Sequence, residues 1–109
     1  MNTNTTCVLI TDICVVENVY HTTRTEARFW RQQTEQISKR HVHMVITPIL
    51  QTRHFHLVLY NKRTRRGFVL NTLQMHDGVT KARQRGRLHY LQHAKIALHH
   101  IATASNQEL

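Results

Sequence analysis

The sequence predicts an α+β domain: a two-layer sandwich in the order β-α-β-β-β-α, with two helices packed on one face of a mostly antiparallel sheet. Residues 23–40 and 88–103 repeat apolar side chains at helical spacing, while residues 41–50 and 53–60 alternate between two kinds of side chain. The 109 residues fit a single domain, 1–109, in which residues 1–5 and 104–109 are expected to fray.

The first strand and the first helix follow from local composition. Residues 6–16 are β-branched and apolar on both faces, which is typical of a strand buried on both sides or of two short strands broken near Thr11. Thr23 followed by Glu26 predicts a capping box at the start of a helix. The side chains that share one arc of this helix are Ala27, Trp30, Thr34 and Ile37, and Trp30 is interpreted as a core anchor.

Three strands are expected to follow as an antiparallel meander. Two alternating stretches and a third strand around Phe68 are separated by turns, of which 61–67 is polar and ends in Gly67. Pro48 is expected to end the first of these strands or to lie on a sheet edge. The apolar positions expected to face the helices are Val42, Met44, Ile46, Phe55, Leu57, Leu59, Phe68 and Leu70.

A final helix is predicted after Asp77, which is a good N-cap residue. Gly86 weakens a helix interior by ~1 kcal/mol relative to Ala, so residues 79–87 are expected to form a separate or kinked turn. The predicted apolar stripe of this helix is Leu88, Leu91, Ala94, Leu98, Ile101 and Ala102. The histidines expected on the opposite side are His89, His93 and His100.

The net charge of +9 lies entirely in the last two thirds of the chain. Residues 1–36 hold three Arg and four acids, net −1, whereas residues 37–109 hold twelve Lys or Arg and two acids, net +10. This distribution excludes an acidic nucleic-acid mimic and disfavours chemistry that needs paired carboxylates. It indicates a polyanionic partner.

Two clusters of cations are the candidate polyanion site, because guanidinium groups bind phosphate as planar forks. They consist of Lys62, Arg63, Arg65 and Arg66 in a strand-connecting turn and Lys81, Arg83, Arg85 and Arg87 at the start of the last helix. We therefore expect a small, non-enzymatic protein that binds DNA, RNA or a nucleoprotein. Since unperturbed histidine titrates near pH ~6.5, binding is expected to tighten as the pH falls from about 7.5 to 6.

A second candidate surface is the sheet face opposite the helices. The side chains expected to project from it are His41, His43, His54, His56 and Tyr60, accompanied by Val45, Val58 and Val69. Such a face would suit a protein partner or a homodimer, with base stacking and plain solvent exposure as the alternatives. Because a chain this short buries a modest fraction of its surface, its core must be compact or shared with a second subunit.

Catalytic and metal-binding motifs are weak. The sequence has no Gly-rich phosphate loop and no nucleophile elbow, so we expect no enzyme, cofactor or metal. The histidine pairs have a spacing that metals accept, but no His-Glu-x-x-His motif accompanies them. Cys7 and Cys14 lie in the first apolar run and are interpreted as reduced and buried, in a cytoplasmic protein without membrane partners.

Two resemblances provide alternatives. The segment 40–46, with its His-Val-His, resembles the histidine motif of replication-initiator and single-strand transposase endonucleases. That resemblance implies a metal-dependent nickase in which His41 and His43 hold the metal and Tyr90 attacks the DNA backbone. The predicted topology of residues 23–104 also resembles the double-stranded RNA-binding domain, and the whole chain resembles ribosome hibernation factors. A further alternative is an inhibitor or adaptor of the kind phages and plasmids encode, docking on a host nucleic-acid-handling complex.

Overall fold

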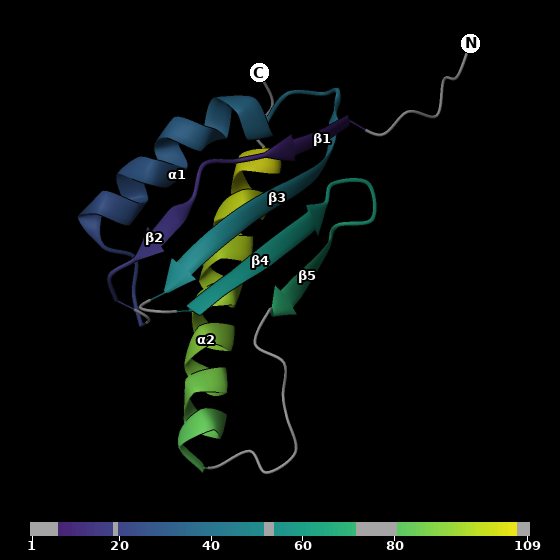
Figure 1. The fold of residues 1–109 in the computed structure, drawn as a ribbon. Helices are drawn as coiled ribbons and strands as arrows, with labels where there is room; N and C mark the ends of the chain where they lie inside the picture. Colours follow the sequence, from purple (N-terminus) through teal and green to yellow (C-terminus); the bar gives the residue numbers. More distant parts are fainter. Residues whose placement is uncertain (1–6, 19, 52–53, 72–80, 107–109) are drawn as a thin grey trace.

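The computed structural model describes residues 7–18, 20–51, 54–71 and 81–106, with side chains for all of these except 71 and 81–90 (Figure 1). It confirms the predicted α+β sandwich, in which α1 and α2 cover one face of a five-stranded sheet. The elements are β1 (Cys7–Ile10), β2 (Cys14–Val16), α1 (Arg24–Ile37), β3 (Val42–Gln51), β4 (His54–Asn61), β5 (Arg66–Asn71) and α2 (Lys81–Ser105).

The sheet has the strand order β1-β3-β4-β5, with β2 also paired to β3. The meander β3-β4-β5 is antiparallel, as predicted, whereas β1 and β2 each pair parallel with β3. Of the two alternatives for the first apolar run, the structure forms the two short strands separated by a break. Thr11 lies at this break, where its backbone N–H donates to the Ile46 carbonyl. Its hydroxyl donates a hydrogen bond to the Thr47 hydroxyl at 2.8 Å.

Pro48 neither ends β3 nor lies on an edge, so that prediction was wrong. On one side of β3, Pro48 pairs with Leu57 of β4. On the other side, β1 pairs with β3 as far as Ile46 and β2 pairs with it from Ile49 onward, so Pro48 lies between the two pairings. The missing N–H of proline thus falls where no strand needs it. The gap between β1 and β2 allows a proline within an inner strand.

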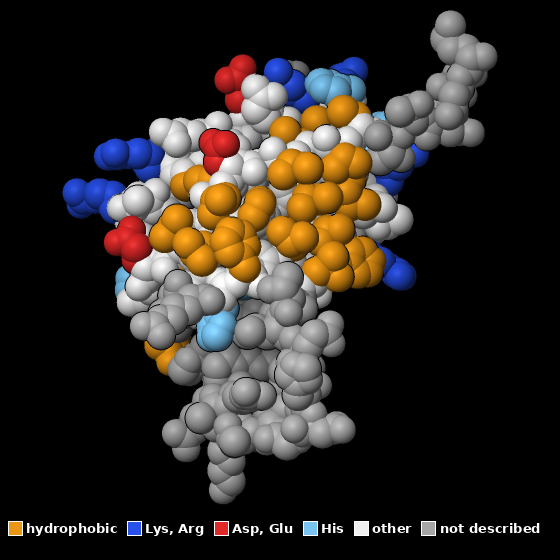
Figure 2. All heavy atoms as spheres, viewed as in Figure 1, with side chains coloured by type: hydrophobic (Ala, Val, Ile, Leu, Met, Phe, Trp, Pro, Cys, Tyr) orange, Lys and Arg blue, Asp and Glu red, His pale blue; other side chains and the backbone are white. Residues whose placement is uncertain are grey.

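The two faces of the sheet are reversed relative to the prediction. Val45, Val58 and Tyr60 are buried beneath the helices, whereas Phe68 and Leu70, which were expected to face the helices, are exposed. Of the whole predicted helix-facing set, only Val42 is buried. Because successive side chains of a strand point to opposite faces, a shift of one residue moves every side chain of that strand to the other face. The open face of the sheet is consequently the apolar surface seen in Figure 2.

Helix α1 begins as predicted, with the Thr23 hydroxyl accepting the N–H of Glu26 at 3.2 Å. The reciprocal half of the capping box is absent, because the Glu26 carboxylate turns into the core. The helix ends at Ile37, three residues earlier than expected. Its buried side chains are Glu26, Trp30, Gln33 and Ile37, so the predicted arc contained Trp30 and Ile37 correctly.

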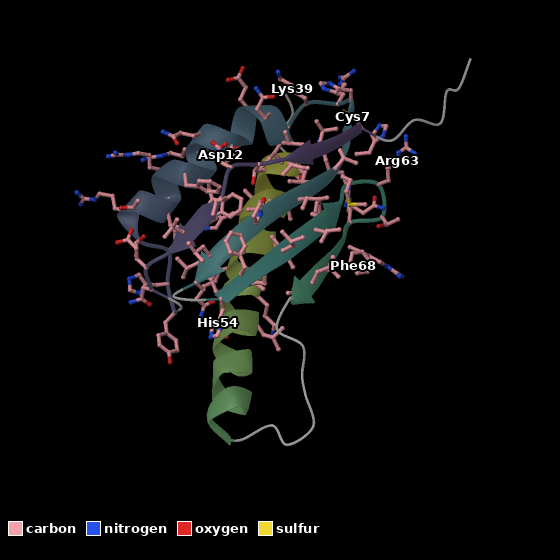
Figure 3. The ribbon with its side chains drawn as sticks, in the orientation of Figure 1. Cys7, Asp12, Lys39, His54, Arg63 and Phe68 are labelled. Atoms are coloured by element: carbon pink, nitrogen blue, oxygen red, sulfur yellow. The ribbon has the colours of Figure 1, made fainter. Side chains whose placement is uncertain are left out.

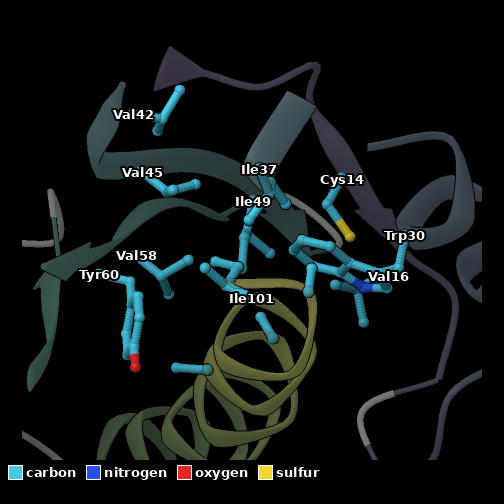
Figure 4. Close-up of a cluster of buried hydrophobic side chains, with 13 residues drawn as sticks. Cys14, Val16, Trp30, Ile37, Val42, Val45, Ile49, Val58, Tyr60 and Ile101 are labelled. Carbon is cyan, nitrogen blue, oxygen red and sulfur yellow. The ribbon is translucent and has the colours of Figure 1, made fainter. Parts of the chain in front are cut away.

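Helix α2 is one continuous helix that includes Gly86, so the predicted separate turn is not formed. Its buried face is turned relative to the predicted stripe: His93 is fully buried rather than exposed. Ala104 is also buried, which places the onset of fraying later than expected. Among the described side chains of α2, those that contribute to the buried hydrophobic core are Ala94, Ala97, Ile101 and Ala104 (Figure 4). These are mostly small, which lets α2 approach the sheet closely.

Candidate functional site

Lys62 joins the turn between β4 and β5 to the end of α1. Its ammonium group donates to the carbonyl oxygen of Ile37, the last residue of α1, at 2.6 Å and to that of Lys39, which also accepts the Val42 N–H, at 3.0 Å. Its backbone N–H donates to the His43 carbonyl at 2.9 Å. Partial burial lowers the pKa of Lys62 from its ordinary value. Of the predicted polyanion-binding residues, Lys62 is thus engaged within the protein as a helix cap.

The turn itself is held in one shape by Asn61. The Asn61 side-chain oxygen accepts the backbone N–H groups of Arg63 at 2.9 Å and Thr64 at 3.2 Å. The Asn61 carbonyl accepts the N–H of Arg65 at 2.8 Å. Arg65 has a φ of 59°, the left-handed region that glycine occupies more readily. The turn therefore presents its arginines from a well-defined backbone.

Around this turn lies a cluster that we call the basic end, composed of Arg40, His41, His43, Arg63, Arg65 and Arg66. All are exposed except His43, which is half-buried and lies 3.3 Å from the Arg63 guanidinium. Residues 37–44 and 61–67 contain no Asp or Glu. Across the part of the chain with described side chains, none of these arginines forms an ion pair. Figure 3 shows Lys39 and Arg63 at this end and His54 at the other.

The second predicted cluster lies elsewhere. Helix α2 begins at the end of the sheet opposite the β4–β5 turn, so its first turns do not join the basic end (Figure 1). The side chains of Lys81, Arg83, Arg85 and Arg87 lie outside the described residues. The structure therefore brings together one of the two clusters and adds to it Arg40, which the sequence reasoning missed. The signal for Arg40 was its place at the end of the predicted first helix, directly before the strand that pairs with the strand leading into the turn.

The predicted histidine face is divided by the structure. His56 and Tyr60 are only 1% and 5% exposed, because they point toward α2 rather than away from it. His54 is exposed at the far end of β4, and His41 and His43 belong to the basic end. The five residues do not form one open face, so the predicted arrangement was wrong. The cause is the reversal of the two sheet faces.

A polar centre lies between the helices and the sheet. His93 Nε2 and Glu26 Oε2 are 2.9 Å apart and both side chains are buried. The His100 ring stacks on Trp30 at 5.4 Å, with Nε2 3.0 Å from the Thr22 hydroxyl, and burial lowers its pKa. Burial, reinforced by the charge of Glu26, raises the pKa of Cys14 to about 12, so this thiol stays protonated and is no nucleophile.

The endonuclease resemblance implies a metal ion held by His41 and His43. Among the described side chains, no group of three or more His, Cys, Asp or Glu lies close enough to hold a metal ion. The guanidinium of Arg63 next to His43 adds a positive charge where the endonuclease resemblance would place a cation. Tyr90 lies in α2, but its side chain is outside the described part. No described helix is long and apolar enough to span a membrane.

No protein-family model matches this chain, and neither does any curated protein or solved structure at a significant level.

Proposed function

We propose that this protein is a non-enzymatic binding protein whose basic end contacts the phosphate backbone of a nucleic acid. Exposed guanidinium groups suit phosphate because each offers a planar, bidentate donor fork. Backbone contacts of this kind give affinity with little sequence preference. DNA and RNA offer the same phosphate chemistry, and the basic end alone does not choose between them.

The observation that carries the proposal is the joining of two segments by Lys62. Its two bonds to the end of α1 hold the loop that contains Arg40 against the turn that contains Arg63, Arg65 and Arg66. Arg40 is thereby held beside three arginines that lie more than 20 residues later in the sequence, and residues 37–44 and 61–67 contain no Asp or Glu. A solvated, solubilising charge run does not need this fixed arrangement.

The left-handed backbone of Arg65 gives further support. A non-glycine residue in this region is disfavoured by roughly 1 kcal/mol or more, and such strain is concentrated at functional sites. Glycine at this position would relieve the strain but would remove one guanidinium. An arginine at this strained position is explained if its positive charge contributes to binding of the phosphate backbone.

The test is a titration of fluorescent single-stranded and duplex oligonucleotides, both DNA and RNA, at several salt concentrations. The wild-type chain is expected to bind, with an affinity that falls steeply as salt rises. The triple variant Arg63→Ala, Arg65→Ala, Arg66→Ala should bind at least ~10-fold more weakly and with a shallower salt slope, because three phosphate contacts are lost. The weaker binding and the shallower salt slope are both expected from the loss of the same three positive charges.

The matched control removes three exposed arginines from α1, Arg24→Ala, Arg28→Ala and Arg31→Ala. It changes the net charge by the same amount, so it separates a localised site from a general attraction to a cationic protein. Equal weakening by the two triple variants would contradict the proposed site. Absence of oligonucleotide binding by the wild type would contradict the proposed function and favour an acidic protein as the partner.

A further inference from the structure

The open face of the sheet is an almost uncharged apolar grid. Strand register places Ile10, Ile46, Leu59 and Phe68 in one row across four strands. The next rows are Pro48, Leu57 and Leu70, and then Val15, Leu50 and Phe55. Only the row at the basic end departs from this character, with Val8 and Met44 followed by Asn61 and Arg66. Figure 2 shows the resulting continuous surface, with the Lys and Arg side chains at its periphery.

The grid is large for a surface that stays in water. Its outer members are strongly exposed, with Ile10 at 67%, Phe68 at 51% and Leu70 at 52%. Six side chains of this kind, with the six partly buried ones between them, expose on the order of 700 Å². The largest apolar patch on a typical monomer is roughly 300–600 Å², and each partner in a standard protein interface buries about 800 Å². An area of this order lies above the usual range of surface patches and below the area that one partner of a standard interface buries.

The other side of the sheet explains why this face matters for stability. The core under the helices takes three alanines from α2 and encloses the polar side chains of Glu26, His56 and His93. The leucines and phenylalanines of β4 and β5 lie on the open face instead. A chain this short buries a modest fraction of its surface within one subunit. Covering the grid would add to the apolar area that each subunit buries.

We propose that the open face is the interface of a homodimer, in which two sheets pack face to face and the helices form the outer layers. Two properties of this face suit a second copy of the same chain. Two sheets with the same twist pack in aligned fashion at about 10 Å separation. Although each copy carries a net charge of +9, the three apolar rows bring no cations together within the interface. A two-fold axis makes the same patch serve both subunits.

The test is sedimentation velocity of the nuclease-treated protein over a range of concentrations, from about 1 to 100 μM. The wild-type chain is expected to sediment as a species of twice the 12.9 kDa of a single chain. The variant Phe68→Glu, Leu70→Glu should be monomeric, because it places four carboxylates in the dimer interface. The matched control is Gln32→Glu, Gln36→Glu, which adds the same charge on the exposed side of α1 and should remain dimeric.

Circular dichroism first establishes that each variant is folded. If the glutamate variant does not fold, Ile10→Thr with Phe68→Thr takes its place, because threonine keeps the strand preference while reducing the apolar area. A wild-type chain that is monomeric throughout, or a folded face variant that is still dimeric, overturns the proposal. The Arg63, Arg65 and Arg66 triple variant should dimerise normally, so failure of the proposed nucleic-acid binding and failure of this inference are separable.

Discussion

His93 Nε2 lies 2.9 Å from Glu26 Oε2, and the two side chains are 0% and 1% exposed. The contact ties α2 to the first turn of α1 across 67 residues of sequence. Glu26 also lies near the N-terminus of α1, where the helix dipole favours a negative charge. Two polar groups that would be expensive to bury alone are thus buried together.

Removing one partner of this pair should destabilise the fold strongly, because the other would remain buried without its hydrogen bond. We expect His93→Leu to lower the free energy of unfolding by about 3 kcal/mol, as for other broken buried pairs. The double variant Glu26→Leu, His93→Leu should lose clearly less than the two single losses combined. Urea denaturation at one fixed protein concentration measures all three. Strictly additive losses would show that the two side chains do not depend on each other.

Stability should fall with acidity because of His56. Burial, with added repulsion from His93 and His54, lowers the pKa of His56 to about 4. An unfolded histidine takes up a proton near pH ~6.5, so between these two values protonation favours the unfolded chain. The contribution is complete above pH ~6.5 and is lost as the pH falls toward 4, amounting to on the order of 2 kcal/mol.

Unfolding measured across this pH range tests the assignment. His56→Gln should flatten the dependence, whereas His99→Gln, which alters an exposed histidine of α2, should leave it close to wild type. A wild-type slope that survives His56→Gln unchanged would mean that another group titrates.

The alternation of the strands was predictable from the sequence, but the choice of face was not. In β4 the residues His56, Val58 and Tyr60 share one side and Phe55, Leu57 and Leu59 the other, as predicted. Hydropathy assigns the second set to the core, yet the first set is buried. The outcome depends on what the helices offer: α2 presents small alanines and a histidine, and these accommodate the first set. If the second set is covered by another copy, both sides of the sheet are interior and hydropathy along one strand cannot rank them.

Only part of the site was predictable, again because contacts between separate elements are not visible along the sequence. Arg63, Arg65 and Arg66 were recognisable because their cluster is local in the sequence. The role of Lys62 was not, since its acceptors at Ile37 and Lys39 belong to another element. Glu26 was assigned to a capping box and His93 to the side opposite the apolar stripe, although Glu26, Trp30, Gln33 and Ile37 follow a regular helical spacing. Only the tertiary arrangement reveals that this stripe is the buried one.

Substitution of Lys62 is expected to lower the stability of the fold rather than the intrinsic affinity for oligonucleotides. Lys62→Met keeps the aliphatic stem but removes the ammonium group that caps α1, and should cost about 1–2 kcal/mol. Arg66→Met, which removes an exposed cation from the same turn, should change stability by less than ~0.5 kcal/mol while weakening polyanion binding. Thermal unfolding and oligonucleotide titration of both variants compare the two roles. A Lys62→Met protein of wild-type stability would contradict the capping role.

Gly67 is needed for close packing rather than for backbone freedom. A Cβ at this position would lie 2.8 Å from Leu98 Cδ2 and 2.9 Å from Cδ1, which is too close. Gly67→Ala should therefore lower the free energy of unfolding by about 1 kcal/mol, the overpacking loss being partly offset by the reduced entropy of the unfolded chain. In a Leu98→Ala background the same change should be neutral or stabilising, because the space is then free. Denaturant unfolding of the four proteins completes this cycle, and an equal loss in both backgrounds would rule out the contact with Leu98.

Arg65 offers the sharpest separation of stability from binding. Since its φ of 59° suits glycine, Arg65→Gly should maintain or raise the free energy of unfolding, by up to ~1 kcal/mol, despite the loss of a side chain. The same variant should bind oligonucleotides several-fold more weakly, with a salt slope reduced by about 1, as expected for one lost phosphate contact. Arg65→Ala provides the control, because it removes the same charge without relieving the backbone. If Arg65→Gly is more stable than Arg65→Ala but both bind like the wild type, the strain is real and the arginine does not contact the polyanion.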